Sequence, residues 1–541
     1  MRRDVVALIV GWTLIALCIP LTLALLVTIF LDDWSLAIRA FLPSLVISGL
    51  AGFLLIRGWV RSDTEERLRD REAFAAVAMC WPAVVAIGAL PFWLSGVFIG
   101  PFTEDAQFVD ILRGGVNSWF ESMSGFTTTG ATVIGETMSP ACKYTVVDDC
   151  INSQPKGLLL WRSLTQWLGG MGIIMLGMLL LARVLGGGMS LARAELTGPS
   201  LSRLRPRLQE TALLLWGIYI GLTLLESSLL WIVADMSLYD AINHGLTTMP
   251  SGGFSTRDAS IAFYDSVTVE TIIVIFMFIA GVNFTLLALM MDGEWRVAIK
   301  DEEARYYVAI LLFCVLFTTG ILSYFGLELG QAFREAIFTI VSIGTSTGYV
   351  NNDYTGAPWP TVSLMILLFL MVMGASAGST SGGLKVLRFN LAIKVAWREL
   401  TRIANPRQVK VIRMNKDPIE EDFISLIVGM LMLWMGLFIL SSIIMAMLLP
   451  GRDFETIISV VASSLGNTGP ALGTYGATDT WASMSTPALL WSTILMWLGR
   501  LELLTALILL HPRTWRFEGK SEEKLTRRAM KAFKELFGKE E

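Results

Sequence analysis

Four short segments of the chain place a glycine beside hydroxyl or amide side chains, and these residue types suit the binding of a monovalent cation. We call them the four glycine segments, and they span residues 127–131, 251–254, 345–349 and 467–470. Glycine permits backbone conformations that direct carbonyl oxygens into a shared space, where they can replace the hydration shell of an ion. Neighbouring Thr and Ser hydroxyls supply further oxygen ligands without adding charge.

The composition indicates that the glycine segments belong to a polytopic membrane protein. Of the 541 residues, 54% are hydrophobic and 16% are charged, against roughly 25% charged residues in an average soluble domain. Two histidines and five scattered cysteines form no motif with the spacing of zinc or iron-sulfur ligands. We therefore expect that the chain is not an enzyme and binds no cofactor itself.

Apolar runs of about twenty residues, the length that crosses a bilayer, recur along the whole chain and predict ten spans. The predicted spans are 5–30, 38–56, 73–98, 158–182, 209–234, 267–291, 306–326, 360–384, 422–449 and 487–510. Most of the 42 lysines and arginines then fall on the side of the N-terminus. Because positive residues accumulate on the cytoplasmic side, both termini are predicted to be cytoplasmic.

Each glycine segment follows a half-length helix pattern and precedes a full span, so the chain contains a fourfold internal repeat. Non-helical backbone at membrane depth is tolerated only where protein or water surrounds it, so the four segments should meet around a common axis. A half-helix entering from the outer face points its negative C-terminal end at the membrane centre, where it favours a cation. The predicted parts are an N-terminal two-helix domain 1–72, pore repeats 73–208, 209–305, 306–420 and 421–512, and a cytoplasmic tail 513–541.

With these segments the chain resembles the TrkH/TrkG membrane subunits of bacterial Trk potassium-uptake systems, within the Trk/Ktr/HKT superfamily. The resemblance covers nearly the whole chain, including the two-helix prefix. It implies an all-α polytopic fold in the bacterial inner membrane, with two N-terminal helices, four membrane-pore-membrane repeats in a pseudo-fourfold arrangement, and a homodimer. The selectivity-filter residues that it implies are Thr127, Thr128, Thr129, Gly130, Ala131, Ser251, Gly252, Gly253, Phe254, Thr345, Ser346, Thr347, Gly348, Tyr349, Asn467, Thr468, Gly469 and Pro470.

The resemblance also implies which ion the filter prefers. In this superfamily a serine in place of the first filter glycine accompanies sodium permeation, and here all four repeats have glycine, which favours potassium as the substrate ion. Phe254 and Pro470, which follow the filter glycine, depart from a TVGYG-type filter and suggest fewer well-formed ion sites. The expected potassium ligands are Thr128, Thr129, Gly252, Gly253, Ser346, Thr347, Asn467 and Thr468.

The predicted span 360–384 continues as a helical pattern to about residue 396, which would exceed the thickness of the membrane. Its middle, loop 374–383, contains four glycines, and each destabilises a helix interior by ~1 kcal/mol, so we expect it to be unwound. The resemblance implies an intramembrane gating loop that includes Gly374, Gly378, Gly382 and Gly383. Alternatives are close helix packing through small residues or a phosphate-binding loop, although the GxxxxGK[ST] pattern is missing.

Arg500 lies inside the predicted span 487–510, where a charge costs ~2.5–3.5 kcal/mol on insertion scales and normally faces a cavity or a partner. The resemblance implies an arginine beneath the filter that forms hydrogen bonds to the carbonyls of the gating loop and repels cations. The alternative is a simple ion pair with Glu226 or Glu502.

The segments 183–208, 385–416 and 511–541 are basic and suit anionic lipid headgroups. The resemblance implies that a soluble TrkA-type regulatory subunit, which binds ATP, ADP or NAD, docks on this cytoplasmic face. The chain itself has no nucleotide-binding motif, and we expect no nucleic-acid partner. On the outer side, Cys142 and Cys150 can form a disulfide if that face is oxidising.

These features predict a potassium-uptake subunit with a gated, passively conducting pore. The closest alternative is a potassium symporter coupled to protons or sodium, which the scarcity of ionisable residues within the spans disfavours. A membrane-embedded enzyme would need a nucleophile with a base, or metal ligands, and the sequence offers no such constellation. A non-conducting receptor would leave four re-entrant segments without a purpose. The potassium-over-sodium ratio and the gating nucleotide stay open.

Overall fold

The structure is a computed structural model that describes residues 3–58, 70–143, 148–185, 208–356, 358–408, 410–419 and 421–501. The predicted tail 513–541 and most of the basic segment 183–208 lie outside the described residues. The described chain is mostly helical, as expected, and its only strands there are the two-residue β1 (Arg413–Met414) and β2 (Asp417–Pro418), which pair antiparallel.

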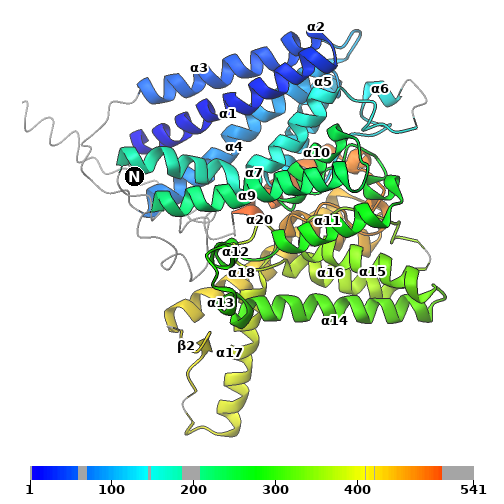
Figure 1. Cartoon of the computed structure of the whole chain (residues 1–541). Coiled ribbons are helices and arrows are strands. Elements are labelled where there is room, and N and C mark those ends of the chain that lie inside the picture. Colours follow the sequence, from blue (N-terminus) through cyan, green and yellow to red (C-terminus); the bar gives the residue numbers. More distant parts are fainter. Residues whose placement is uncertain are drawn as a thin grey trace, which may run out of the picture.

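The N-terminal part is a pair of long antiparallel helices (Figure 1). Helix α1 (Arg3–Leu31) is followed by α2 (Trp34–Leu36), a π-helix (Ala37–Phe41) and α3 (Leu42–Gly58). The helices approach closely at Gly11 and Gly52, because a Cβ on Gly11 would lie 2.9 Å from the Gly52 carbonyl oxygen. Small residues at such a crossing allow two membrane helices to pack backbone against backbone.

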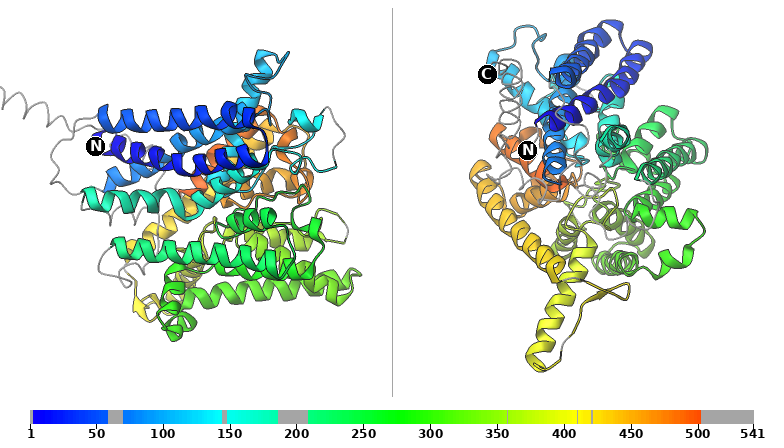
Figure 2. Two further views of the ribbon diagram at one scale, coloured as in Figure 1. Left: turned by 45° about the horizontal axis from the view of Figure 1, so that its top comes forward. Right: turned by 90° about the vertical axis from the view of Figure 1, so that its left-hand side faces the viewer.

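The remaining helices form four groups, and in each group a helix that ends at a glycine segment lies between the other helices in chain order. The groups are α4 (Asp70–Ser95), α5 (Phe108–Phe126) and α7 (Lys156–Leu185); α9 (Leu208–Ile232), α10 (Leu238–Thr248), α11 (Val267–Ala280) and α12 (Phe284–Met291); α14 (Glu302–Tyr324), α15 (Leu329–Gly344) and α16 (Thr361–Met373); and α18 (Glu421–Leu448), α19 (Phe454–Gly466) and α20 (Thr486–Arg500). The right view of Figure 2 shows these groups surrounding the centre of the molecule.

Short elements lie within and between these groups, and one longer helix leaves the body. Within the groups are α6 (Pro140–Lys143) and three 3₁₀ turns at Ser260–Tyr264, Gly473–Tyr475 and Trp481–Ser483, and α13 (Trp295–Lys300) connects the second group to the third. Helix α17 (Val386–Ala404) projects away from the other helices together with the β1–β2 pair (Figure 1).

Six helices of the described chain are long and apolar enough to cross a membrane, or seven if one bent pair counts as a span. The bent pair corrects the prediction of a continuous span over 267–291, because α11 and α12 meet at 100°. Gly281 ends α11, and the side chain of Asn283 caps α12 by accepting a hydrogen bond from the Thr285 amide. This capping stabilises the start of a new helix where the hydropathy pattern alone predicts continuity.

The predicted span 360–384 also ends early. Helix α16 stops at Met373, and helical structure resumes only at Val386, so loop 374–383 is unwound as expected. Gly374 adopts φ +67°, and a Cβ there would lie 2.2 Å from the Gly382 carbonyl oxygen. The loop therefore turns back on itself in a way that only glycine permits at this position.

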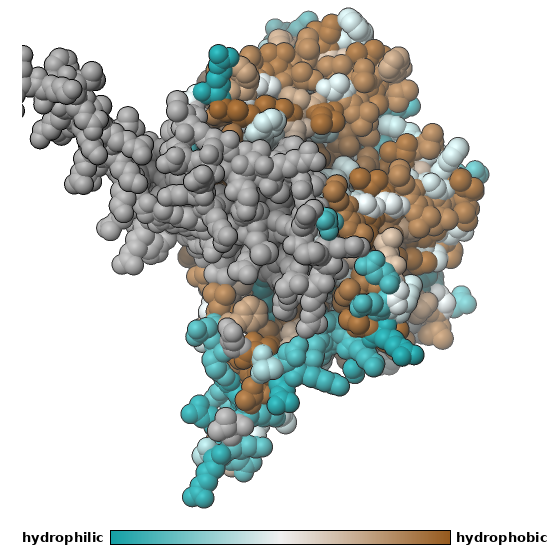
Figure 3. Space-filling view, turned by 60° about the vertical axis from the view of Figure 1, so that its left-hand side comes forward, coloured by the Kyte–Doolittle hydropathy of each residue, from teal (hydrophilic) through white to brown (hydrophobic). Residues whose placement is uncertain are grey.

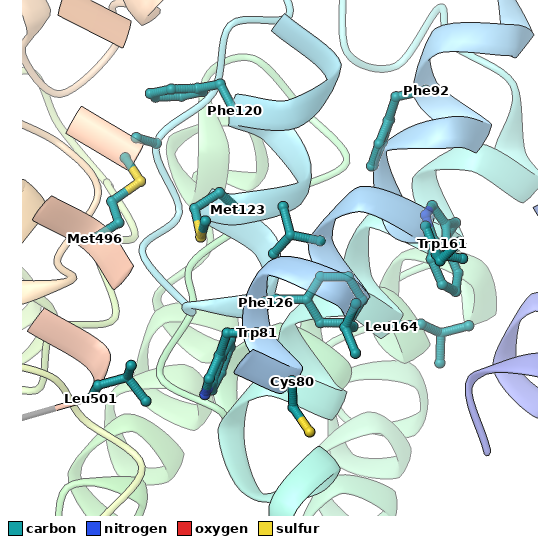
Figure 4. Packing of buried hydrophobic residues seen from close by; sticks show 14 of the residues in the cluster. Cys80, Trp81, Phe92, Phe120, Met123, Phe126, Trp161, Leu164, Met496 and Leu501 are labelled. Carbon is teal, nitrogen blue, oxygen red and sulfur yellow. The ribbon is translucent and has the colours of Figure 1, made fainter. Parts of the chain in front are cut away.

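The short helices are held by the main hydrophobic core. Phe126, at the end of α5, packs edge-on against Trp161 of α7 with ring centroids 6.3 Å apart (Figure 4). The Trp161 indole donates a 3.1 Å hydrogen bond to the Gly88 carbonyl oxygen of α4. The end of α5 is thus fixed between both long helices of its own group.

Large apolar side chains also cover much of the outside of the body. Leu312, Phe313 and Leu316 of α14 and Met432 and Ile443 of α18 are each more than half exposed. In Figure 3 such hydrophobic residues cover the body, whereas hydrophilic residues gather on the projecting end. An apolar surface of this extent is typical of a protein that faces lipid.

Candidate ion-binding site

The four glycine segments share one backbone conformation at the ends of α5, α10, α15 and α19. The resemblance implies Gly130, Gly253, Gly348 and Gly469 as the filter glycines, and we use that name for them. In each segment, the amide of the residue before the filter glycine donates a hydrogen bond of 2.8–3.0 Å to the carbonyl oxygen five residues earlier. These bonds join Thr129 to Ser124, Gly252 to Thr247, Thr347 to Ser342, and Thr468 to Ser463. Positive φ recurs two residues apart in every segment, at Thr128 and Gly130, Ser251 and Gly253, Ser346 and Gly348, and Asn467 and Gly469.

The four segments also contact one another in a closed ring. A Cβ added to each filter glycine would lie 1.8–2.5 Å from a carbonyl oxygen of the next segment. The close pairs are Gly130 with Gly252, Gly253 with Thr347, Gly348 with Thr468, and Gly469 with Thr129. The structure therefore brings together the four segments that the sequence predicts to meet around an axis. Their filter glycines are required both because the backbone has a positive φ there and because a carbonyl oxygen of the next segment lies too close for a side chain.

All four filter glycines line one cavity of about 490 Å³. Its wall also carries three carboxyl side chains, Glu136, Asp258 and Asp479, and two arginines, Arg162 and Arg257. Burial raises the pKa of the Asp258 carboxyl above its ordinary value, and this carboxyl accepts hydrogen bonds from the amides of Cys150 and Ile151. The wall beside the ring of glycines thus carries charged groups of both signs.

Three side-chain oxygens of the predicted ligand set are buried without a hydrogen-bond partner among the described residues. They are Thr128 Oγ1, Thr468 Oγ1 and Asn467 Oδ1. Other hydroxyls of the set are paired, as Thr129 Oγ1 is with Thr127 Oγ1 at 2.8 Å. Buried oxygens normally have a partner, so the three unpaired atoms are available to a bound ion or water.

Loop 374–383 contacts three of the glycine segments or the helix ends before them. The Thr380 hydroxyl lies 2.9 Å from the Ser251 hydroxyl, and the Gly382 amide donates a 2.6 Å hydrogen bond to Ser346 Oγ. A Cβ on Gly382 would lie 2.1 Å from the Gly466 carbonyl oxygen, at the end of α19. The loop therefore lies directly against the N-terminal ends of these glycine segments.

Arg500 connects the same loop to the first repeat. Its guanidinium donates hydrogen bonds of 2.8 Å to the Thr380 carbonyl oxygen and of 2.8 and 3.1 Å to those of Gly169 and Gly170 in α7. Neither carboxyl oxygen of Glu226 has a hydrogen-bond partner within the described part of the chain, which argues against an Arg500–Glu226 pair, and Glu502 lies outside the described residues. The arginine–carbonyl contacts implied by the resemblance are thus present.

The break between α11 and α12 accommodates loop 374–383, a contact that sequence reasoning missed. The Phe284 amide donates to the Gly378 carbonyl oxygen at 3.0 Å, and the Ser376 amide donates to that of Gly281 at 3.2 Å. The one local signal for the break is the pair Gly281 and Asn283, a helix-ending and a helix-capping residue close together.

Two buried charged residues at the loop were also missed. Glu303 of α14 accepts a hydrogen bond from the Ala377 amide at 2.5 Å, and Lys385 donates to both the carbonyl and the hydroxyl oxygen of Ser381. Both side chains are less than 5% exposed. Their positions at the ends of apolar runs made them look like ordinary flanking charges in the sequence.

A buried ion pair joins the first two glycine segments on their outer side. Arg162 Nε lies 2.7 Å from Glu121 Oε1, and its guanidinium carbon lies 3.5 Å from the Phe254 ring centroid. Arg162 also donates to the Ser255 carbonyl oxygen, while Glu121 accepts from the Val133 amide. The pair thereby fixes the chain just after Ala131 relative to the chain just after Gly253.

Glu121→Gln is expected to lower the free energy of unfolding by ~3–5 kcal/mol, because it leaves the buried Arg162 without a countercharge. The measurement is the melting temperature of the purified protein in detergent. Glu399→Gln is the matched control, since it removes the same charge from the more exposed pairs with Arg398 and Arg402 and should cost at most about 1 kcal/mol. Equal melting temperatures for the two variants would contradict a stabilising role for the buried pair.

Cys142 and Cys150 form a disulfide, with their Cα atoms 5.6 Å apart. The Asp258 carboxyl that accepts hydrogen bonds from Cys150 and Ile151 follows the second glycine segment. The disulfide loop is therefore attached to the rim of the cavity.

Comparisons with known proteins agree with this geometry. The family model TrkH, described as a cation transport protein, matches residues 56–516. The chain is 36% identical to the Trk system potassium uptake protein TrkH of Salmonella typhimurium, over 88% of this chain and 92% of that protein, and 31% identical to TrkG of Escherichia coli, over 83% and 85%. The crystal structure of the potassium transporter TrkH from Vibrio parahaemolyticus aligns with a TM-score of 0.79 and 30% identity, over 95% of this chain and all of that one. The chain therefore belongs to the TrkH family of membrane cation transport proteins.

Proposed function

We propose that this chain is the translocating subunit of a bacterial Trk potassium-uptake system and forms a gated, potassium-selective pore through the inner membrane. The names of the relatives identify them as potassium uptake proteins. The proposal includes the division of residues 73–512 into four pore repeats and potassium binding at the four glycine segments. The chain belongs to a family of transporters and is not an enzyme.

The observation that carries this proposal is the closed ring of four glycine segments around one cavity. Each segment follows the C-terminal end of a short helix, and the four helix ends together provide a negative field that favours a cation. Carbonyl oxygens from four equivalent backbone turns can replace the hydration shell of potassium. Uncharged hydroxyl and amide oxygens supplement these ligands.

The gate in this proposal is loop 374–383 held by Arg500. The loop touches the second, third and fourth repeats, and Arg500 extends the contacts to α7 of the first. A segment attached to all four repeats beneath the filter blocks an ion path unless it moves. The positive charge of Arg500 adds an electrostatic barrier to cations in the same place.

The proposal places both termini in the cytoplasm, together with the projecting α17. This helix carries Lys394, Arg398 and Arg402 away from the apolar body, and hydrophilic residues gather there (Figure 3). A polar projection of this kind suits a soluble partner, here a TrkA-type subunit that binds ATP, ADP or NAD. The proposed assembly contains two copies of this chain.

The reversal potential of the purified chain in liposomes tests this function, with potassium on one side and sodium on the other. A reversal potential that follows the potassium gradient and ignores pH is expected for a passive, selective pore. A reversal potential that shifts with pH at fixed cation gradients would instead establish a proton-coupled symporter. Equal permeation of potassium and sodium would contradict the proposed selectivity.

A further inference from the structure

The second glycine segment differs from the other three at the residue before the filter glycine. The first, third and fourth segments have Thr129, Thr347 and Thr468 there, whereas the second has Gly252. Unlike Gly130 and the other filter glycines, Gly252 does not have a positive φ. Its backbone conformation is therefore open to any residue, and another reason must explain the missing side chain.

The reason is the side chain of Gln166, which reaches from α7 into the space beside Gly252. A Cβ on Gly252 would lie 2.4 Å from Gln166 Cδ, 2.4 Å from Oε1 and 2.8 Å from Nε2, and these are its three nearest atoms. Gln166 is completely buried. The side-chain amide thus occupies the place that the threonine side chain fills in the other repeats.

The Gln166 amide forms hydrogen bonds on both sides of the filter glycine of this segment. Its Nε2 donates to the Gly252 carbonyl oxygen at 2.7 Å, and its Oε1 accepts from the Phe254 amide at 3.1 Å. Because a carbonyl only accepts and an N–H only donates, these two partners fix the orientation of the side-chain amide. Gly253 therefore lies between two backbone groups that are both hydrogen-bonded to the Gln166 side-chain amide.

The first and third segments achieve a related restraint with their own side chains. Thr127 and Thr129 pair through hydroxyls 2.8 Å apart, and Thr345 and Thr347 do the same. In the second segment the residue corresponding to Thr127 is Pro250, which has no hydroxyl. The second segment therefore lacks both partners of that pair, and Gln166 supplies the restraint from outside the segment.

We propose that Gln166 is a specificity-determining positioning residue, which replaces the missing threonine of the second repeat and fixes the Gly252 carbonyl oxygen for potassium coordination. This inference rests on the proposed function as a potassium-selective pore. The amide donor has a second effect, because it occupies one of the two lone pairs of the Gly252 carbonyl oxygen. The ring of carbonyls is thereby made unequal at the second repeat.

The test is the reversal potential of Gln166→Ala in liposomes, with potassium and sodium on opposite sides. The substitution removes the two hydrogen bonds that the Gln166 side chain makes to the second segment. The potassium-over-sodium permeability ratio is therefore expected to fall about five- to tenfold. The decisive variant is the double substitution Gln166→Ala with Gly252→Thr. The three atoms nearest to a Cβ at Gly252 all belong to Gln166, so shortening Gln166 removes the closest contacts that exclude a threonine, and at least half of the wild-type ratio should return.

Gln154→Ala is the matched control, since Gln154 is equally a buried glutamine but bonds to the disulfide loop rather than to a glycine segment. It should keep the wild-type ratio. An unchanged ratio in folded Gln166→Ala protein, or a double variant no better than the single one, would overturn the role of Gln166. Failure of the proposed function is a separate outcome, because the wild-type chain itself would then show no potassium preference in the same liposomes.

Discussion

Gly130→Ser is expected to reduce the potassium-over-sodium permeability ratio of the pore about tenfold or more. Gly130 has φ +87°, and a Cβ there would lie 2.2 Å from the Gly252 carbonyl oxygen. A side chain at this position both strains the backbone and pushes on a proposed potassium ligand of the next repeat. Forcing extra atoms into a packed site costs typically ~1–3 kcal/mol, and ~1.4 kcal/mol corresponds to a tenfold change in an equilibrium.

The ring geometry makes this substitution more than a local change. Each filter glycine faces a carbonyl oxygen of the following segment, so displacement of Gly252 is passed toward Gly253 and from there toward Thr347. A selective filter requires several oxygens at matched distances, and one shifted segment changes the whole set. The permeability of sodium is expected to rise relative to that of potassium, because a distorted ring of oxygens no longer favours the larger ion.

The measurement is again the reversal potential with potassium and sodium on opposite sides of the liposome membrane. Gly320→Ser in α14 is the matched control, because no atom lies within 4 Å of a Cβ at Gly320 and its φ is not positive. The control should keep the wild-type ratio. If Gly130→Ser also keeps it while the protein stays folded, the carbonyl ring does not determine ion preference.

Arg500→Ala is expected to raise potassium flux in the absence of any cytoplasmic partner by about tenfold or more. The substitution removes the hydrogen bonds from Arg500 to the Thr380, Gly169 and Gly170 carbonyl oxygens. Hydrogen bonds to a charged group contribute ~1.5–3 kcal/mol, and losing that amount from the closed state alone shifts the closed–open equilibrium at least tenfold. Loss of the positive charge also lowers the barrier to cations.

The readout is potassium-driven flux into liposomes that contain the chain alone. Arg398→Ala serves as control, because Arg398 forms ion pairs with Glu399 and Glu421 on the projecting side and does not touch the loop. A second variant, deletion of residues 374–383, removes the proposed obstruction without changing Arg500 and should raise flux as well. If both folded variants conduct like the wild type, the loop and its arginine are not the gate.

The fourfold repeat was predictable from the sequence because it depends on local patterns. Half-helix patterns before Gly130, Gly253, Gly348 and Gly469 predicted α5, α10, α15 and α19, and the glycine content of loop 374–383 predicted the end of α16. The roles of these residues in selectivity and gating stay predictions that the variants above test.

Two contacts between segments far apart in the chain were not predicted from the sequence. A hydropathy pattern averages over many residues, so it read 267–291 as one span, although Gly281 and Asn283 end one helix and begin another. The break matters only because loop 374–383, about a hundred residues later, hydrogen bonds to it. Gln166 likewise has no local signal that points to Gly252, because the two residues lie more than eighty positions apart.

By itself, the sequence determined the membrane class and the repeated helix and glycine pattern. These properties follow from composition and from short-range backbone preferences, which each segment carries alone. Only the tertiary structure decided that four glycines face four carbonyl oxygens in a closed ring, that Arg500 also bonds to the Gly169 and Gly170 carbonyl oxygens, and that Gln166 fills the space at Gly252. These contacts form when segments that are distant in the chain pack together. Each hydrogen bond or filled space depends on both segments, so the sequence of one segment alone does not reveal it.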